Sequence, residues 1–301
     1  MNKSIIYTII FILTIAGILL LVLFKTPEFL EPEEPGLPTE AIEETGEEKP
    51  DVMDQQETPA PAEVKKPVIT ITGQELAEKV YNRDDGDSAH SITEMVLRDK
   101  NGHERKRIME MYTKDFDPLV RAFIEFTDPA DIRGTRFLSW ENADEDDTQY
   151  LYLPELGRAR RIVSNQKKLR FVNTDFSYED MERRKPDEDK HEISGEAVYL
   201  QRPVFILESE PFPDTSQYGR RETFVDQESL IPVSIDFYDK KGELIKEFRV
   251  HELKEIDGIW TAMSAEMRDL EAGHKTFMNL KEVEYNIDLS EQYFELRNLE
   301  Q

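Results

Sequence analysis

Between residues 91 and 285 the chain repeats one pattern, in which a short strand signal is followed by a turn. The clearest case is the pair of segments 91–98 and 104–114, which flank Asp99-Lys100-Asn101-Gly102. Asn-Gly is the strongest short signal for a hairpin. Because no long helices alternate with the strands, a Rossmann-type fold is excluded and a mainly β, antiparallel fold is predicted. Further strands are predicted at residues 119–126, 135–141, 150–153, 196–208, 218–225, 231–238, 244–253, 260–268 and 275–285.

Three short helices are predicted in addition to the strands. Thr72 and Glu75 have the spacing of a capping box, so the first helix is predicted to start at Thr72. The second is predicted at 178–183, before Lys185-Pro186, and the third at 289–299. The strands nevertheless dominate the predicted fold.

The first 25 residues are predicted to be a membrane anchor. Residues 5–24 carry no charge, and twenty such residues can span a bilayer as a helix. A cleaved signal peptide is the alternative, but this apolar run is longer than usual and no small-x-small cleavage site follows it. The chain has no cysteine, which excludes an acylated lipoprotein anchor. Lys3 and the amino terminus, against Lys25 alone, predict that the amino terminus lies inside.

Residues 26–66 are predicted to be a disordered acidic tether. They contain thirteen acidic residues against three lysines, and seven of the sixteen prolines. Such a segment cannot bury enough apolar surface to offset its ordering entropy. The remaining residues, 67–301, are predicted to be the folded domain, with 33 basic and 51 acidic residues and a net charge of −18. This charge excludes nucleic-acid binding, because phosphates would be repelled.

The segment 150–181 combines a strand, a basic cluster and an acidic aromatic run. Alternation in the strand predicts that Tyr150 and Tyr152 point to one face and Leu151 and Leu153 to the other. It contains YLPELGRARRI from Tyr152 and NTDFSYEDM from Asn173, and DPADIRGTRFL lies upstream from Asp128. These motifs closely resemble the bacterial outer-membrane lipoprotein-sorting family, whose fold is related to that of the periplasmic carrier LolA. The resemblance covers residues 70–299. The family pattern has a Gly where this chain has Asn173, and Asn tolerates a left-handed backbone nearly as well.

The resemblance implies a mainly β (α+β) domain built on a strongly curved antiparallel sheet. The sheet forms an unclosed β-barrel with covering helices, around an apolar cavity that holds acyl chains. Alternation along four strands assigns one face to this cavity, although a shift of one residue would exchange the faces and a tightly packed core is the alternative. The predicted cavity residues are Met95, Leu97, Met109, Met111, Ile124, Phe126 and Phe137.

The motif residues themselves are predicted to lie at the rim of the curved sheet. The acidic ones are expected to cap the short helix and to pair with Arg158, Arg160 or Arg161, and a polar gate at the cavity mouth is a further hypothesis. The predicted rim residues are Tyr152, Pro154, Glu155, Arg160, Arg161, Asp175, Phe176, Tyr178, Glu179 and Asp180.

No sequence pattern predicts catalysis, a cofactor or a metal. The five histidines lack metal-ligand spacing, and no nucleophile elbow, P-loop or dinucleotide fingerprint is present. The acidic loop at 144–147 lacks the EF-hand pattern. We therefore predict that the protein is not an enzyme and uses no cofactor and no metal.

Together these observations predict a single-pass protein of the inner membrane whose domain faces the periplasm. It is expected to bind acyl chains of lipids or lipoproteins and to carry or present them for outer-membrane sorting and transport. The family resemblance implies an export pump of the envelope as a partner. The alternative is an envelope sensor or scaffold, whose domain regulates a membrane partner.

Overall fold

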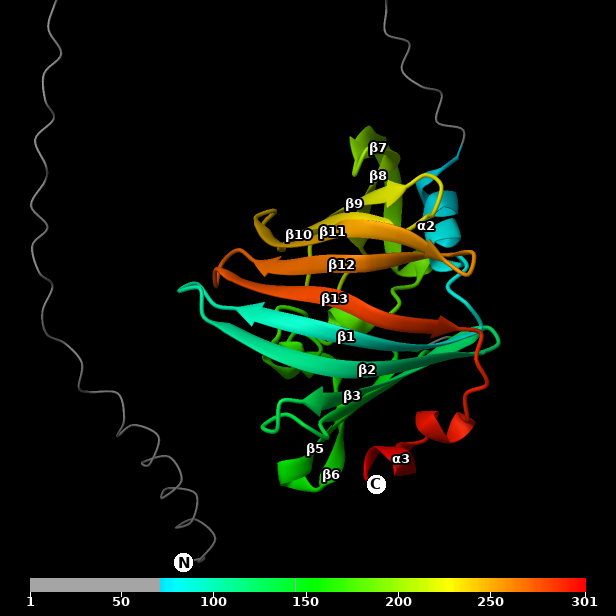
Figure 1. The fold of residues 1–301 in the computed structure, drawn as a ribbon. Coiled ribbons are helices and arrows are strands. Elements are labelled where there is room, and N and C mark those ends of the chain that lie inside the picture. Colours follow the sequence, from blue (N-terminus) through cyan, green and yellow to red (C-terminus); the bar gives the residue numbers. More distant parts are fainter. Residues whose placement is uncertain (1–70, 144) are drawn as a thin grey trace, which may run out of the picture. The chain divides into compact units, whose positions relative to one another are not determined.

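The computed structural model describes residues 71–143 and 145–301, which form a single curved antiparallel sheet of 13 strands with few helices (Figure 1). The predicted anchor and the predicted tether lie outside the described residues. In the described part of the chain, no helix is both long and apolar enough to cross a membrane. The domain boundaries at residues 25 and 66 stay predictions.

Each strand pairs antiparallel with its neighbours in the sheet. The strands are β1 (Ser88–Arg98), β2 (Glu104–Phe116), β3 (Leu119–Asp128), β4 (Arg136–Trp140), β5 (Thr148–Leu153), β6 (Arg158–Ile162), β7 (Asp189–Tyr199), β8 (Arg202–Pro211), β9 (Arg220–Asp226), β10 (Pro232–Tyr238), β11 (Leu244–Ile256), β12 (Ile259–Asp269) and β13 (His274–Tyr285).

The order of the strands shows that the sheet does not close into a barrel, because its two edge strands do not pair with each other. The order runs β6-β5-β4-β3-β2-β1-β13-β12-β11-β10-β9-β8-β7, so two meanders meet where β1 pairs with β13. Strands β6 and β7 follow each other in the chain but form the two opposite edges of the sheet. Residues 163–188 connect these edges, and we call them the crossover segment. The predicted unclosed, mainly β sheet is therefore confirmed.

The helices are short. They are α2 (Gly73–Tyr81), α3 (Leu296–Leu299) and the 3-10 turns η1 (Pro154–Leu156), η2 (Ser164–Gln166), η3 (Phe171–Asn173), η4 (Glu179–Met181), η5 (Pro186–Glu188) and η6 (Glu291–Phe294).

Helix α2 covers one end of the sheet. It begins with the predicted capping box, in which the Thr72 side chain accepts from the Glu75 N–H and the Glu75 side chain accepts from the Thr72 N–H. Its Leu76 packs against Leu207 and Val225 of β8 and β9. Only a glycine permits this approach, because a Cβ at Gly73 would lie 2.6 Å from the carbonyl carbon of His191.

Two strand predictions were wrong. Residues 196–208, predicted as one strand, belong to the hairpin β7–β8, which turns at Leu200 and Gln201. Both turn residues have positive φ, 50° and 61°, which is uncommon without glycine or asparagine, so no turn signal stands in the sequence. Strand β6 was also missed, because its basic cluster lacks the apolar alternation of a strand.

Two of the predicted helices are shorter in the structure than expected. The helix expected at 178–183 is the 3-10 turn η4. The helix expected at 289–299 is divided into η6 and α3, because Glu295 has an extended backbone with ψ of 143°. The hairpin turn predicted around Asn101-Gly102 is confirmed, and Gly102 there has a φ of 85°.

The two faces of the sheet have different covers. On the outer face of β2–β5, the C-terminal segment buries Leu289, Phe294 and Leu299 against Phe123 and Leu138, and it lies beside that end of the sheet in Figure 1. On the inner face, the crossover segment is the cover. The alternation predicted for β5 is confirmed, since Tyr150 and Tyr152 belong to the outer cluster and Leu151 to the inner one.

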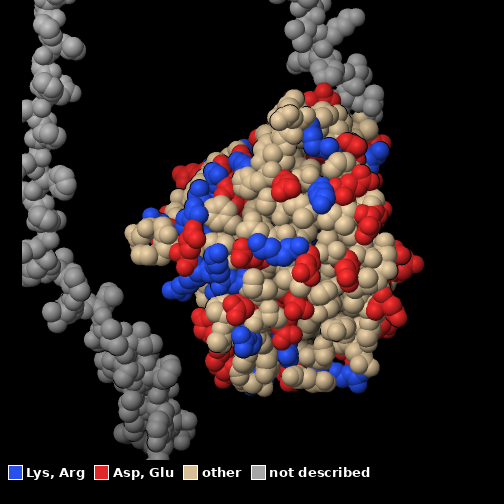
Figure 2. All heavy atoms as spheres, in the orientation of Figure 1, with Lys and Arg blue, Asp and Glu red and all other residues tan. Residues whose placement is uncertain are grey.

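Acidic side chains are spread over the face of the molecule shown in Figure 2, whereas lysines and arginines gather toward its left side. The acidic excess of the sequence is therefore distributed over this face rather than concentrated in one patch.

The crossover segment contributes to the core, and this can be measured. Phe171→Ala is expected to lower the free energy of unfolding by about 3–5 kcal/mol, because the ring is 1% exposed and its loss leaves a cavity. Leu169→Ala, in the same segment but 52% exposed, should change it by less than about 0.5 kcal/mol. Urea unfolding followed by circular dichroism gives both values, and equal losses would contradict the core role of the segment.

The crossover segment also contains a carboxyl group with an unusual pKa. Burial raises the pKa of Glu182 to about 7, although the ammonium of Lys167, 2.8 Å away, opposes the shift. Between the ordinary value of 4.5 and about 7, the folded protein holds a proton that the unfolded chain has lost. Stability therefore falls as the pH rises through this window, and above it the group adds no further pH dependence.

Glu182→Gln should remove this part of the pH dependence, up to about 3 kcal/mol. The check is the free energy of unfolding at pH 5 to 8 for the natural chain, for Glu182→Gln and for the exposed control Glu192→Gln. An unchanged slope in Glu182→Gln would show that the carboxyl titrates normally.

Candidate functional site

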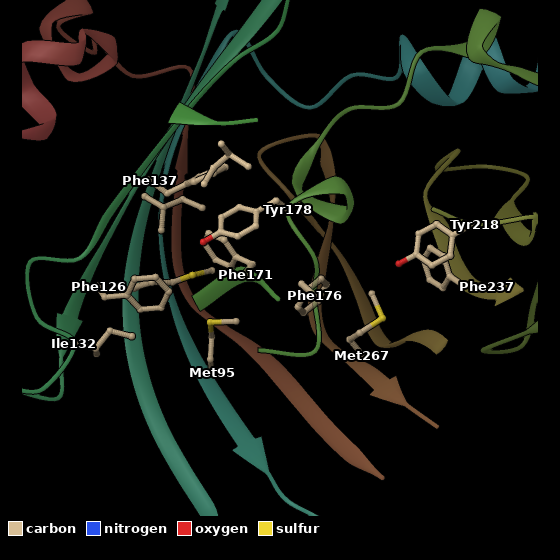
Figure 3. Close-up of a cluster of buried hydrophobic side chains, with 13 residues drawn as sticks. Met95, Phe126, Ile132, Phe137, Phe171, Phe176, Tyr178, Tyr218, Phe237 and Met267 are labelled. Carbon is tan, nitrogen blue, oxygen red and sulfur yellow. The ribbon is translucent and has the colours of Figure 1, made fainter. Parts of the chain in front are cut away.

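The crossover segment fills the space inside the curved sheet. Its residues Phe171, Phe176 and Tyr178 lie between the strands that carry Phe126 and Phe137 and those that carry Phe237 and Met267 (Figure 3). Phe171 packs edge-on against Phe137, with ring centroids 5.1 Å apart, and against Tyr178 at 5.7 Å. The segment is thus part of the interior and not a surface loop.

The tip of the crossover segment turns back on itself. The Phe171 N–H donates to the Phe176 carbonyl over 2.8 Å, and Val172 and Asn173 between them have φ of 45° and 59°. Asn173 therefore has the left-handed backbone that its glycine-like place in the motif predicts. The Arg107 guanidinium donates to the Val172 carbonyl over 2.5 Å and fixes the tip to β2.

Asp175 ties this tip to β13. Its Oδ2 accepts from the Thr276 hydroxyl over 2.7 Å, and its N–H donates to the Thr276 Oγ1 over 3.0 Å. Burial raises the pKa of Asp175, and the Thr276 hydrogen bond and the Arg170 guanidinium 3.6 Å away offset part of the rise. The Asp175 carboxylate therefore has a structural role, because it holds the crossover segment on β13.

Asp180 ties the other end of the motif to β11. Its Oδ1 accepts from the Tyr218 hydroxyl over 2.7 Å, and its Oδ2 accepts from the Lys246 ammonium over 2.8 Å. Burial, together with the Asp180 charge, raises the pKa of Tyr218. Glu179 accepts from the Ser216 hydroxyl and, over 3.0 Å, from the Gln217 N–H.

Beside the crossover segment lies a cavity of about 390 Å³, which we call cavity A. Helix α2 and strands β7–β12 form its other walls. Its charged lining residues come mainly from the crossover segment, with Glu182, Arg183 and Arg184, and from β9, with Arg221. Its apolar lining residues include Leu207, Val225, Ile235, Phe237, Phe248 and Met267.

A second cavity of about 420 Å³, cavity B, lies over β1–β3 and β11–β13. Arg83, Arg183 and Phe248 line both cavities, so the two are neighbours. Arg183 is held by the Tyr81 carbonyl at 2.6 Å, and its guanidinium stacks over the Tyr81 ring. The apolar and small residues of cavity B are Met111, Val120, Ala122, Ala265, Met278 and Leu280.

All seven predicted cavity residues lie in one apolar cluster at the inner face of the sheet. Met111 lines cavity B. The other six, Met95, Leu97, Met109, Ile124, Phe126 and Phe137, belong to the cluster that packs around the crossover segment. Five of these six are at most 2% exposed, so this part of the face is packed core. The crossover segment therefore fills the space beside these six residues, where a ligand was predicted.

The ten predicted rim residues divide into two groups. Pro154, Glu155, Arg160 and Arg161 are exposed around η1 and the edge strand β6, and Tyr152 is half-buried on the outer face. The rim prediction was wrong for Asp175, Phe176 and Tyr178, which are buried under the sheet because the crossover segment runs through the interior. Glu179 and Asp180 are half-buried and line cavity A.

The predicted pairing of the motif acids with the basic cluster was also wrong. Asp175, Glu179 and Asp180 have the partners described above, far along the chain in β11, β13 and residues 216–218. Arg158, Arg160 and Arg161 form no ion pair within the described ranges. The acids point into the interior, whereas the arginines lie at the sheet edge.

Sequence reasoning missed the residues of cavity A on β8–β12. Their signal was present, since Arg221, Thr223 and Val225 alternate along β9, and Ile235 and Phe237 alternate along β10. A choice between the two faces of these strands could not be made without knowing which strands the crossover segment covers.

Comparison with known proteins places this architecture in a family. A family model described as an uncharacterized protein matches residues 119–301, more than half of the chain. No curated protein is similar to the chain.

Three solved structures have the same fold over most of the chain. A DUF1329 family protein from Desulfovibrio piger is 29% identical, with a TM-score of 0.72, and the match covers 75% of this chain and 97% of that one. An outer-membrane lipoprotein-sorting protein domain from Vibrio parahaemolyticus is 27% identical, with a TM-score of 0.72 and coverage of 76% and 98%. A LolA superfamily protein from Nitrosomonas europaea, 18% identical, shares the fold with a TM-score of 0.59 and coverage of 75% and 98%.

The family match and the structures from Desulfovibrio piger and Vibrio parahaemolyticus agree with the resemblance carried by the motifs at 128–138 and 152–181. The chain therefore belongs to the LolA-like family of DUF1329 and outer-membrane lipoprotein-sorting proteins.

Proposed function

We propose that this protein binds acyl chains of lipids or lipoproteins in cavities A and B and carries or presents them within the cell envelope. The observation that carries the proposal is the pair of neighbouring cavities, about 390 and 420 Å³, which share Phe248 and have apolar walls. Both lie within the size range of small-molecule sites. Residues of the crossover segment line cavity A, and its Arg183 also lines cavity B.

A binding function needs no reactive group at this site. Each buried methylene contributes about 0.8 kcal/mol, so a chain of ordinary length gains enough from an apolar wall alone. The carboxylates of the crossover segment are occupied by Thr276, Lys246, Tyr218 and Gln217, which supports a structural use for them rather than acid–base catalysis.

The family supports the same class of ligand. The relative from Vibrio parahaemolyticus is described as an outer-membrane lipoprotein-sorting protein domain. We extend this to the present chain as a proposal, together with the anchor at 5–24, the tether at 26–66, a periplasmic domain and an export pump as partner. In this arrangement the anchor keeps the domain at the inner membrane, where it would receive or pass on its lipid.

A neutral lipid probe tests the proposal on the full chain. Phosphatidylcholine nanodiscs that hold the protein are loaded with a photoactivatable hexadecanol, and labelled peptides are identified by mass spectrometry. Labelling is expected at cavity residues of β2, β10 and β12. Met111→Arg should reduce labelling in cavity B about tenfold, since a charged group replaces apolar contacts worth one or two methylenes.

The matched control is Met263→Arg, because Met263 is also half-buried in a strand but lies outside the lining of cavities A and B. It should leave the labelling unchanged. Labelling restricted to residues 5–24, with none in the domain, would contradict an acyl-chain function.

A further inference from the structure

Arg221 is a cation that lines cavity A together with apolar residues. It lies on β9 opposite Phe237 of β10, its side chain is 12% exposed, and Leu207 and Val225 line the same cavity. Its Nη2 donates to Asp189 Oδ2 over 2.7 Å. Its Nε and Nη1 make no hydrogen bond to any of the residues that the structure describes. Two donor groups of a guanidinium in the cavity lining therefore have no partner among the described residues.

The negative charge of Asp189 neutralises the positive charge of Arg221 only in part. The carboxylate is 4% exposed and is shared with Arg184, whose Nη2 and Nε lie 2.6 and 2.9 Å from Oδ1. Both arginines therefore draw on one carboxylate, and Glu188 assists only Arg184, at 3.2 Å. Burial lowers the pKa of the Arg221 guanidinium, as it does for a cation that has lost water without a full counter-charge.

The other acids of the cavity wall are already engaged. Asp180 is bound by Lys246 and Tyr218, and Glu182 by Lys167. Glu179 accepts from Ser216 and Gln217 and forms no ion pair with Arg221 among the described residues. A buried charge that is only partly paired is costly, so a second anion at Arg221 would be bound favourably.

We propose that Arg221 binds the anionic end, a carboxylate or a phosphate, of a lipid whose acyl chain lies along Ile235, Phe248 and Met267. This proposal rests on the proposed function. It specifies that the lipid is anionic and that its anionic end lies at Arg221. A guanidinium suits this task because its planar N–H groups can donate in pairs to two oxygens of one anion. Arg221 lines the same cavity as the apolar residues that would hold the chain.

The test compares two probes that differ only in their end group. Photoactivatable hexadecanoic acid and photoactivatable hexadecanol are each added to the full chain in phosphatidylcholine nanodiscs, and labelling of the β10 and β12 peptides is measured. The natural chain should prefer the acid over the alcohol. Arg221→Leu should lower the acid-to-alcohol ratio about tenfold, the size of one charge-assisted contact, while alcohol labelling persists.

Two further variants make the result specific. Arg220→Leu removes the neighbouring arginine, which points to the opposite side of β9 and pairs with Glu222 at 3.3 Å, and should leave the ratio unchanged. Arg221→Leu leaves Asp189 paired with Arg184, so the fold should persist. If it does not fold, Arg221→Gln keeps the polar side chain without its charge and should lower the ratio in the same direction.

Competitors identify the source of the anion. Unlabelled hexadecyl phosphate should displace the acid probe, whereas inorganic phosphate should not. Displacement by inorganic phosphate alone, or equal labelling by acid and alcohol in the natural chain, would overturn the proposal. Absence of labelling by both probes would instead overturn the proposed function.

Discussion

An antiparallel sheet that curves without closing must cover its inner apolar face, and here one connection does so. The two edge strands β6 and β7 are consecutive in the chain, so the residues between them have to cross from one edge of the sheet to the other. They do so through the interior, where Phe171, Phe176 and Tyr178 are buried. The path of the crossover segment determines where the cavities lie. It also determines that the motif at 173–181 is inside the protein and which partners its carboxylates bind.

A connection that runs through an apolar interior has to satisfy its own polar groups. Asp175 and Asp180 do this by binding Thr276 on β13 and Lys246 on β11, so the crossover segment is fixed to the second meander. Toward the first meander the same segment packs with aromatic rings, as between Phe171 and Phe137. The interior beside β1–β6 is therefore mostly packed with side chains, although cavity B lies over β1–β3. Beside β7–β12 the interior contains cavity A.

Local signals in the sequence predicted those elements that local physics determines. The capping box at Thr72 and Glu75, the Asn101-Gly102 turn and the two faces of β5 need only neighbouring residues, and the structure has all three. The turn at Leu200 was missed because its residues carry no turn signal, and its positive φ goes with the antiparallel pairing of β7 with β8. Residue spacing within a strand shows which side chains share a face, but not which long-range segment covers that face.

The same limit explains the outcome for the candidate site. Met95 and Ile124 were correctly placed on the inner face, yet they contact the crossover segment rather than an open cavity. Nothing in the pair Arg220-Arg221 distinguishes Arg221 from the other arginines of the sequence. Its importance arises only when β7 brings Asp189 and the crossover segment brings Arg184 beside it, because then one carboxylate is shared by two guanidinium groups.

The net charge of the domain also constrains how a ligand could be bound. With 33 basic and 51 acidic residues at 67–301, and acids spread over the face shown in Figure 2, the domain does not attract anionic lipids at long range. Exposed charges are moreover screened beyond about 8 Å at physiological salt, whereas a buried group such as Arg221 is screened much less. Any affinity for an anionic end group must therefore arise at short range, after the apolar chain has entered cavity A. Such binding would be selective for molecules that carry both parts, since inorganic anions lack the chain that offsets the repulsion.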